Sequence, residues 1–155
     1  MNELRVLPVT REQLSLWAPM REALYSDLEP AFHQEEMESL LASDEAECFL
    51  VWEGDEVVGM LELSLRNFVD GCVGGPVGYI EGIYLRPEHR GGGRGRRLIE
   101  FAAEWARSRG CTDLATDAEI DNVEAQEFYR RAGFAERWRT VGFTLSLESR
   151  SPDDS

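Results

Sequence analysis

The stretch Arg90-Gly91-Gly92-Gly93-Arg94-Gly95 lies between a strand pattern and a helix pattern. Residues 79–85 before it alternate between two faces, as in a strand. Residues 96–109 after it repeat apolar side chains at helical spacing, and Gly110 is suited to end that helix. A helix start offers free N–H groups and the positive end of the helix dipole to an anion, and glycines let a phosphate approach the backbone. The stretch therefore predicts a phosphate-binding loop, and a flexible turn is the alternative interpretation of the glycines alone.

The order of residues in this loop disfavours two common nucleotide sites. A Walker loop ends in Gly-Lys-Ser/Thr, whereas this loop continues with Arg96-Arg97. The glycine spacing also differs from the GxGxxG pattern of dinucleotide-binding folds. Arginines nevertheless gather at residues 86–97 of an otherwise acidic chain, which favours an anion as the ligand.

The rest of the chain predicts a mixed α/β sheet with helices on both faces. A capping box formed by Thr10 and Gln13 predicts a first helix, which Pro19 kinks or restarts. Further helices are expected over residues 35–42 and 122–132, and further strands over residues 48–52, 57–65, 112–118 and 138–147. Residues 1–148 are expected to form one domain, and residues 149–155 a disordered polar tail.

Composition restricts the class of protein. The chain of 155 residues is 43% hydrophobic and 30% charged, which suits one folded domain. Its sequence has no apolar run of membrane-helix length and no secretory pattern, so we expect a cytoplasmic protein without a membrane partner. The net charge of −14 disfavours nucleic acid and suits a polycationic partner. Three widely spaced cysteines predict free thiols, with neither a disulfide framework nor a metal site.

Two motifs resemble those of the GCN5-related N-acetyltransferases, the GNAT superfamily. Residues 90–95 match the R/Q-x-x-G-x-G/A motif of that family, and residues 121–134 match its second coenzyme A motif, in the expected order and at the expected separation. The resemblance implies the GNAT fold: a mixed, mostly antiparallel twisted sheet with helices on both faces and a fourth and fifth strand that splay apart. Acetyl-CoA would lie in that wedge.

The resemblance also implies which residues bind acetyl-CoA. Backbone groups of the fourth strand would pair with the pantetheine arm, N–H groups of the loop would hold the pyrophosphate, and Asn122 would contact the pantetheine side. The implied cofactor-binding residues are Ile83, Tyr84, Leu85, Arg90, Gly91, Gly92, Gly93, Arg94, Gly95, Arg96, Asn122 and Tyr129.

Longer stretches are similar to one branch, the aminoglycoside 6′-N-acetyltransferases of type I. They include residues 24–27, 60–66, 76–90 and 115–122, so this resemblance covers nearly the whole chain. It implies that the 6′-amine of an aminoglycoside attacks acetyl-CoA directly in a ternary complex, and that this acetylation confers resistance. It also implies a homodimer with residues 141–147 at the contact. The implied substrate-binding residues are Tyr25, Phe68, Glu81, Asp117 and Glu136.

Four positions depart from this branch. Tyr25 stands where the branch often has tryptophan, and Phe68 aligns with a tyrosine. Trp138 aligns with an acidic residue, and Tyr129 with a residue that is histidine in many relatives. These departures bear on which drugs are accepted more than on the cofactor.

Glu81 and Asp117 also suit a polycation on physical grounds. On two splayed strands their carboxylates would hold neighbouring ammonium groups, although surface carboxylates are the simpler interpretation without the resemblance. An amine must lose a proton before it attacks, so Glu81 is expected to be the base, directly or through water, while Asp117 orients the substrate or serves as the base instead. Tyr129 is expected to protonate the departing CoA thiolate, as in other branches, or to be only a core aromatic residue.

Two other functions fit the same motifs. One is acetyl transfer to another amine, such as a polyamine, a metabolite or a protein N-terminus. The other is a non-catalytic acyl-CoA-binding module, which would bind the cofactor without turnover on any amine.

Overall fold

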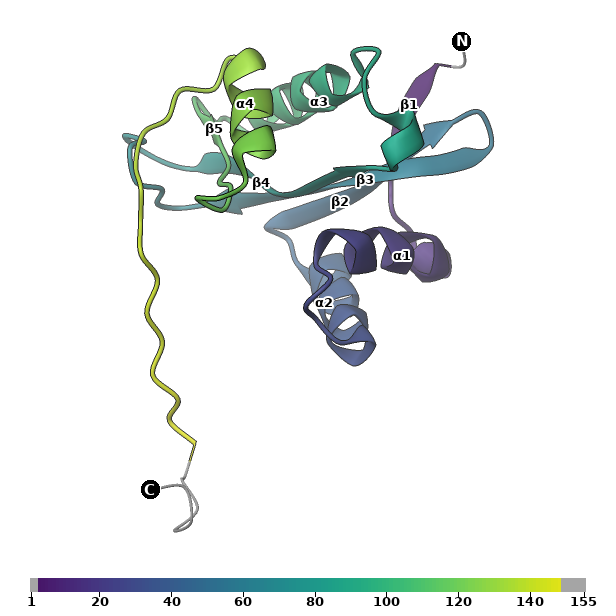
Figure 1. The fold of residues 1–155 in the computed structure, drawn as a ribbon, viewed down its shortest axis with the longest axis horizontal. Coiled ribbons are helices and arrows are strands. Elements are labelled where there is room, and N and C mark those ends of the chain that lie inside the picture. Colours follow the sequence, from purple (N-terminus) through teal and green to yellow (C-terminus); the bar gives the residue numbers. More distant parts are fainter. Residues whose placement is uncertain (1–2, 149–155) are drawn as a thin grey trace.

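The structure, a computed structural model, describes residues 3–148, and its strands form one five-stranded sheet (Figure 1). The strands, in their order across the sheet, are β1 (Leu4–Pro8), β2 (Ala46–Glu53), β3 (Glu56–Arg66), β4 (Val77–Leu85) and β5 (Leu114–Ala115). The helices are α1 (Leu14–Leu24), α2 (Pro30–Ala42), α3 (Arg94–Ser108) and α4 (Val123–Arg131), with 3₁₀ turns η1 (Arg11–Gln13) and η2 (Pro87–His89). Neighbouring strands are antiparallel except for β4 and β5, which are parallel.

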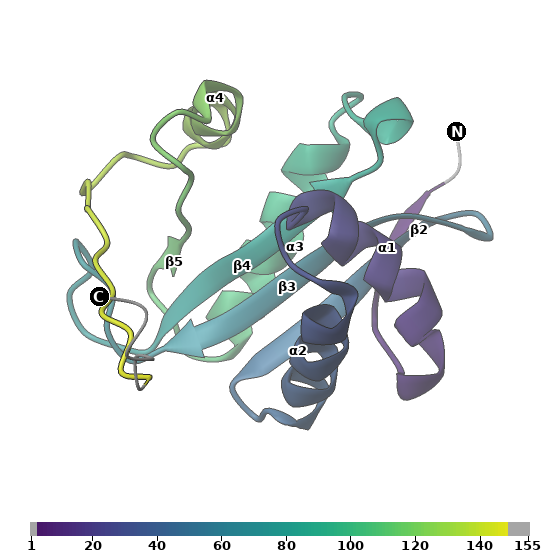
Figure 2. The same cartoon turned by 60° about the horizontal axis from the view of Figure 1, so that its bottom comes forward.

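Helices cover both faces of the sheet, because the central strands are apolar on both sides. Figures 1 and 2 show α1 and α2 on one face and α3 and α4 on the other. Leu50 and Met60 pack toward α1 and α2, in a buried cluster that includes Trp17, Met20 and Met37. Their strand neighbours point the other way and pack with α3, in a cluster that includes Phe49, Leu61, Ile80, Ile99, Ala102 and Trp105. This period of two is the alternation that identifies a strand in the sequence.

The parallel pair of strands is short and then opens. Gly78 pairs with Leu114 and Tyr79 with Ala115. Beyond them, no strand of the described chain pairs with that edge of β4, whereas the other edge pairs with β3 as far as Leu85. The predicted splay between the two strands is therefore confirmed.

Most of the predicted elements are also confirmed, with shifted ends. The Thr10 N–H donates to Gln13 Oε1 at 3.0 Å, as the capping box predicted. Helix α1 continues through Pro19 as a single helix, and α2 begins at Pro30, earlier than expected. Strand β1 was not predicted, because its five residues offer too short an alternation to identify. None of the helices in residues 3–148 has the length and apolar character needed to cross a bilayer.

The prediction of a final strand over residues 138–147 is wrong for this chain on its own. Residues 135–148 form no strand. Trp138 still packs against a buried cluster at the end of the sheet, and Figure 1 shows the chain after this contact running away from the body of the molecule. A strand requires a neighbour for its backbone N–H and C=O groups, and within the described residues this segment has none. The predicted disordered tail, residues 149–155, lies outside the described residues.

Candidate active site

The glycine loop opens directly into helix α3. Gly91, Gly92 and Gly93 have φ angles of +86°, +62° and +80°, in the region that favours glycine. Among the described residues, the N–H groups of Gly92, Gly93, Gly95 and Arg96 donate to no protein acceptor. An added Cβ at Gly91 or Gly93 would meet nothing within 4 Å, so one side of the loop is open. Together these features place free donors on an open loop at a helix N-terminus, which suits a phosphate group.

The arginine side chains of the loop are mostly bound to protein groups. Arg90 Nε donates to the Leu85 carbonyl at 2.9 Å. Arg94 forms two hydrogen bonds of 2.9 Å with Glu53 at the end of β2, and these bonds hold the pKa of the Glu53 carboxyl below its ordinary value. Arg96 is exposed and forms no side-chain hydrogen bond within residues 3–148. The donors of this region that remain available to an anion, within residues 3–148, are therefore the loop N–H groups and the exposed side chains of Arg96 and Arg97.

The free edge of β4 begins at a β-bulge centred on Glu81. Glu62 pairs with Gly82 and Leu63 with Ile80, so Glu81 is an extra residue in β4. Beside the bulge, Thr116 Oγ1 donates to the Ile80 carbonyl at 3.0 Å, at the point where β5 leaves β4. The expected cofactor residues Ile83, Tyr84 and Leu85 follow on the open edge, between the bulge and the glycine loop.

The Glu81 carboxylate is bound by residues of β3. Arg66 donates from Nη2 to Oε1 at 2.7 Å and from Nε to Oε2 at 3.0 Å, and the Ser64 hydroxyl also donates to Oε2. Glu81 is thus held in one orientation by a bidentate ion pair, the arrangement that arginine favours with carboxylates. Neither Arg66 nor Ser64 was predicted to be part of the site.

Asp117 joins the same cluster through Tyr79. The Tyr79 hydroxyl donates to Asp117 Oδ2, and burial together with this hydrogen bond raises the pKa of Tyr79. The Arg66 guanidinium lies 3.5 Å from the centre of the Tyr79 ring. The two carboxylates that the sequence singled out are therefore joined by one chain of contacts at the splayed strands.

Helix α4 supplies the next two predicted residues. Asn122 is its N-cap, and Asn122 Oδ1 accepts a hydrogen bond from the Ala125 N–H at 3.1 Å. Tyr129 packs against Phe128 and Phe134, with ring centres 5.3 and 5.4 Å apart. Burial raises the pKa of Tyr129 above its ordinary value.

Tyr25 is directed inward. Its hydroxyl donates to the Glu81 carbonyl at 3.1 Å and lies 3.3 Å from Glu62 Oε1. Glu62 is buried and forms an ion pair of 2.6 Å with Arg21, and it also accepts from Trp17 Nε1 at 2.9 Å. This buried polar network lies directly beneath the bulge. The sequence offered one signal for it, a carboxylate at an inward position of β3.

The last two predicted substrate residues are not linked to the carboxylates. Phe68 is exposed on the loop between β3 and β4. Glu136, which follows α4, forms ion pairs with Arg130 of that helix and with Arg139. Within residues 3–148, no hydrogen bond or ion pair connects Glu136 to Glu81 or Asp117.

Taken together, the geometry offers an anion-binding loop, an open strand edge and a pair of carboxylates along one line of the sheet. Such a line suits an extended ligand that has a phosphate group at one end and meets a cationic second substrate at the other.

Comparison with known proteins agrees with this geometry. Residues 17–134 match the acetyltransferase (GNAT) family. The chain is 37% identical to an aminoglycoside N(6′)-acetyltransferase type 1 from Acinetobacter haemolyticus, over 94% of this chain and 100% of that protein. It is also 37% identical to the enzyme of that name from Stenotrophomonas maltophilia, over 90% of this chain and 91% of that protein.

Solved structures are similar over the same length. The crystal structure of an aminoglycoside 6′-N-acetyltransferase from Acinetobacter haemolyticus has a TM-score of 0.86 and 36% identity, covering 93% of this chain and 99% of that one. A second aminoglycoside 6′-N-acetyltransferase, in complex with the bisubstrate analogue CoA-S-monomethyl-acetylneamine, has a TM-score of 0.87 and 25% identity, covering 94% and 99%.

Proposed function

Because the chain belongs to the acetyltransferase (GNAT) family, we propose that it transfers the acetyl group of acetyl-CoA to the 6′-amine of aminoglycosides and so confers resistance to them. One observation carries this proposal: a loop with free N–H donors, an open strand edge and two carboxylates follow one another along β4 and β5. Similarity to aminoglycoside 6′-N-acetyltransferases over almost the full length of both chains supports the substrate class.

The residues present fit acetyl-CoA, which supplies an activated acetyl thioester when bound. The N–H groups of Gly92, Gly93, Gly95 and Arg96 would hold its pyrophosphate. Residues 83–85 of β4 carry the backbone groups that would pair with its pantetheine amides. Asn122 faces a competing demand, since its side chain already caps α4. It would therefore act by placing the start of that helix.

The acceptor amine would be oriented by Glu81 and Asp117. Their side chains are joined through Arg66 and Tyr79, so a rigid polycation can place two ammonium groups against one cluster. Tyr25 supports Glu81 from beneath through the Glu81 carbonyl. The net charge of −14 would draw a polycation toward the protein.

One of the two carboxylates removes a proton from the amine before direct attack in the ternary complex. We assign this step to Glu81, directly or through water, with Asp117 orienting the substrate; the reverse assignment is the alternative. Tyr129 would hold a proton at its hydroxyl for the departing thiolate. The Tyr129 hydroxyl is protonated at neutral pH, as an ordinary tyrosine is, while burial raises its pKa and makes it a weaker acid.

We also propose that two copies of the chain exchange their C-terminal segments. In this segment Val141, Phe143, Leu145 and Leu147 are 76%, 90%, 81% and 90% exposed. They alternate along the chain, so an extended segment places all four on one side. Such a surface normally lies against another element, because exposed contiguous apolar patches mark interaction sites.

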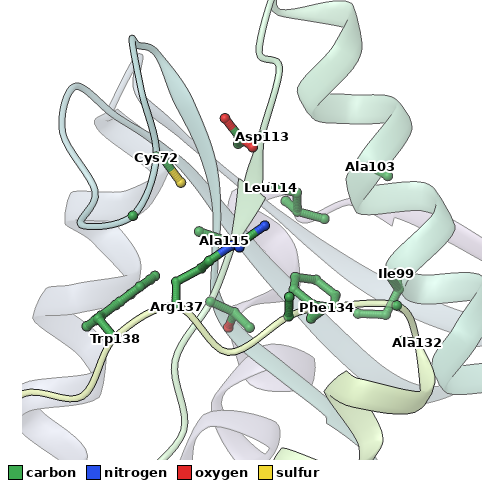
Figure 3. Close-up of a pocket in the computed structure, with 14 residues that line it drawn as sticks. Cys72, Ile99, Ala103, Asp113, Leu114, Ala115, Ala132, Phe134, Arg137 and Trp138 are labelled. Carbon is green, nitrogen blue, oxygen red and sulfur yellow. The ribbon is translucent and has the colours of Figure 1, made fainter.

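The receiving surface lies beside β5. A pocket of about 360 Å³ is lined by Leu114 and Ala115 of β5, by Ile99 of α3, and by Phe134 and Trp138 of the segment that follows α4 (Figure 3). Strand β5 is the last strand of the sheet, so one of its edges is free. A strand from a second copy would fill this pocket and extend the sheet. The resulting homodimer would give this segment the strand neighbour that it does not have among residues 3–148.

Two further assignments complete the proposal. We propose that residues 1–148 act as one catalytic domain, which the pairing of β1 with β2 supports. We propose the cytoplasm as its place of action, which the three free cysteines support.

The proposal is tested by product analysis. Acetyl-CoA and an aminoglycoside with a 6′-amine are incubated with the full-length enzyme, and the product is analysed by mass spectrometry and NMR. We expect one added acetyl group, located on the 6′-nitrogen. An acetyl group on another nitrogen would contradict the position, and binding of CoA without any product from aminoglycosides, polyamines or peptides would identify a non-catalytic binding module.

A further inference from the structure

The first residue of α3, Arg94, is held by the carboxylate of Glu53, which lies beside the turn of the β2–β3 hairpin. Arg94 donates to both oxygens of Glu53, with Nε–Oε2 and Nη2–Oε1 distances of 2.9 Å. The two side chains are 20% and 12% exposed, so the ion pair is largely shielded from solvent. This bidentate geometry fixes the direction as well as the distance of the guanidinium.

Glu53 also contacts the residue that precedes the glycine loop. His89 Nδ1 lies 3.5 Å from Glu53 Oε2. Arg94 in turn reaches back to the loop, with Nη1 3.4 Å from the Gly91 carbonyl oxygen. The Glu53 carboxylate thus contacts His89, just before the loop, and Arg94, which follows its three consecutive glycines.

The loop requires such support because it is built from glycine. Three consecutive glycines at positive φ have more conformations to lose than other residues when the loop becomes ordered. Their N–H groups bind a pyrophosphate only when they converge, and order that exists before binding lowers the cost of binding. Glu53 is itself placed by the sheet, since it pairs with Leu4 of β1 and Glu56 of β3.

We propose that Glu53 is a positioning residue for the cofactor, holding the pyrophosphate loop in its binding conformation through Arg94 and His89. This inference builds on the proposed function, because it assumes that the loop binds the pyrophosphate of CoA. No motif contains Glu53, and its partner Arg94 is 41 residues away in the sequence.

The direction in which CoA affinity changes when Glu53 is replaced distinguishes a positioning role from a long-range effect of its charge. Glu53 is an anion near a site for an anion, so removal of its charge would strengthen CoA binding if only long-range charge mattered. Release of Arg94 as a new phosphate ligand would act in the same direction. A positioning role predicts the opposite result, weaker binding.

The test is calorimetric titration of CoA into the full-length protein and its variants. In Glu53→Gln we expect the Kd of CoA to rise by about tenfold, the scale of losing charge-assisted hydrogen bonds. Asp55→Asn is the matched control, because it removes the same charge in the same hairpin from an exposed side chain that has no hydrogen bond or ion pair within residues 3–148. Glu53→Asp keeps the charge but shortens the reach, and we expect it also to weaken binding.

A second measurement excludes a general structural effect. S-acetylpantetheine carries the reactive thioester but no pyrophosphate. We expect Glu53→Gln to leave the KM of S-acetylpantetheine and of the amine unchanged while it raises the KM of acetyl-CoA. Equal or tighter CoA binding in Glu53→Gln than in Asp55→Asn would overturn the positioning role, as would a matching rise in KM for S-acetylpantetheine. Failure of the wild-type protein to bind CoA would instead overturn the proposed function.

Discussion

The two carboxylates at the splayed strands are satisfied in different ways. Both oxygens of Glu81 accept from Arg66, and Oε2 also accepts from Ser64, whereas Asp117 accepts from the Tyr79 hydroxyl. The orientation of Glu81 is therefore set by an ion pair, and that of Asp117 by a hydrogen bond from a neutral hydroxyl. In both cases the orientation is set before a substrate arrives, which is the condition for efficient proton transfer from a bound amine.

Replacement of Glu81 tests its assigned role. In Glu81→Gln we expect kcat to fall by about 10²–10⁴-fold, the usual contribution of a positioned base. The Kd of CoA should not change, since Glu81 lies outside the phosphate loop. Glu104→Gln, on the exposed face of α3, is the control for charge. Full turnover in Glu81→Gln with loss of turnover in Asp117→Asn would move the base role to Asp117.

Tyr129 gives a prediction about pH. Burial raises its pKa, so the hydroxyl remains protonated beyond the ordinary tyrosine value of about 10. If Tyr129 protonates the thiolate, Tyr129→Phe should lower kcat by at least about tenfold across neutral and mildly alkaline pH. The measurement is kcat against pH for both proteins. An unchanged kcat in Tyr129→Phe would show that the residue is only a core aromatic.

At this scale, local motifs identify residues that act near their neighbours in sequence. The glycine loop follows from a short pattern, whereas Asn122 and the pair Glu81 and Asp117 follow from the resemblance to a family. The structure places Glu81 and Asp117 in one cluster. Arg66, Ser64 and Glu53 could not be found in this way. Each acts through a partner on another strand or helix, and no local pattern specifies such a pair.

At the scale of elements, α1 is attached to the sheet by a buried ion pair. Arg21 and Glu62 are both buried, and Trp17 and Tyr25 of the same helix region also bond to Glu62. This network lies under the bulge at Glu81, because the Tyr25 hydroxyl reaches the Glu81 carbonyl. It therefore couples the position of α1 to the geometry of the site.

Breaking this pair should be costly. In Arg21→Met the Glu62 charge remains buried without its counterion, and we expect the free energy of unfolding to fall by about 3–5 kcal/mol. Arg107→Met, which removes an exposed ion pair with Glu104, should change it by less than about 1 kcal/mol. Urea unfolding of both variants provides the measurement. Equal stability of the two would contradict the structural role of the network.

The elements themselves were predictable to different degrees. Strong periodicity identified α3 and α4, and alternation identified β2, β3 and β4. Strand β1 escaped notice because it is short and partly exposed. The inward carboxylate of Glu62 was visible as an exception to the apolar face of β3, but its partner Arg21 was not, since the two lie 41 residues apart.

At the scale of the whole molecule, the segment after α4 is the part whose predicted structure differs from the observed one. The segment after α4 shows an alternating apolar pattern, and the sequence alone therefore predicts a strand there. Whether such a segment forms a strand depends on a neighbouring edge, which the sequence does not specify. In this chain the free edge of β5 and the pocket beside it face no partner strand among residues 3–148.

The proposed exchange predicts a dimer that depends on this segment. Phe143→Asp places a charge in the apolar row and should convert the protein to a monomer at micromolar concentration. Thr144→Asp adds the same charge on the other side of the segment and serves as the control. Light scattering coupled to size-exclusion chromatography measures the mass. A monomeric wild-type protein, or a dimeric Phe143→Asp variant, would contradict the exchange.

The central claim is that the loop at Arg90–Gly95 and the carboxylates Glu81 and Asp117 form one site for acetyl transfer to a polycationic amine. The most direct test is the rate of thiol release from acetyl-CoA with aminoglycosides that have or lack a 6′-amine, with polyamines and with a peptide. We predict turnover only with the aminoglycosides that carry the 6′-amine. Turnover confined to polyamines or the peptide, or equal turnover with drugs that lack the 6′-amine, would contradict the claim.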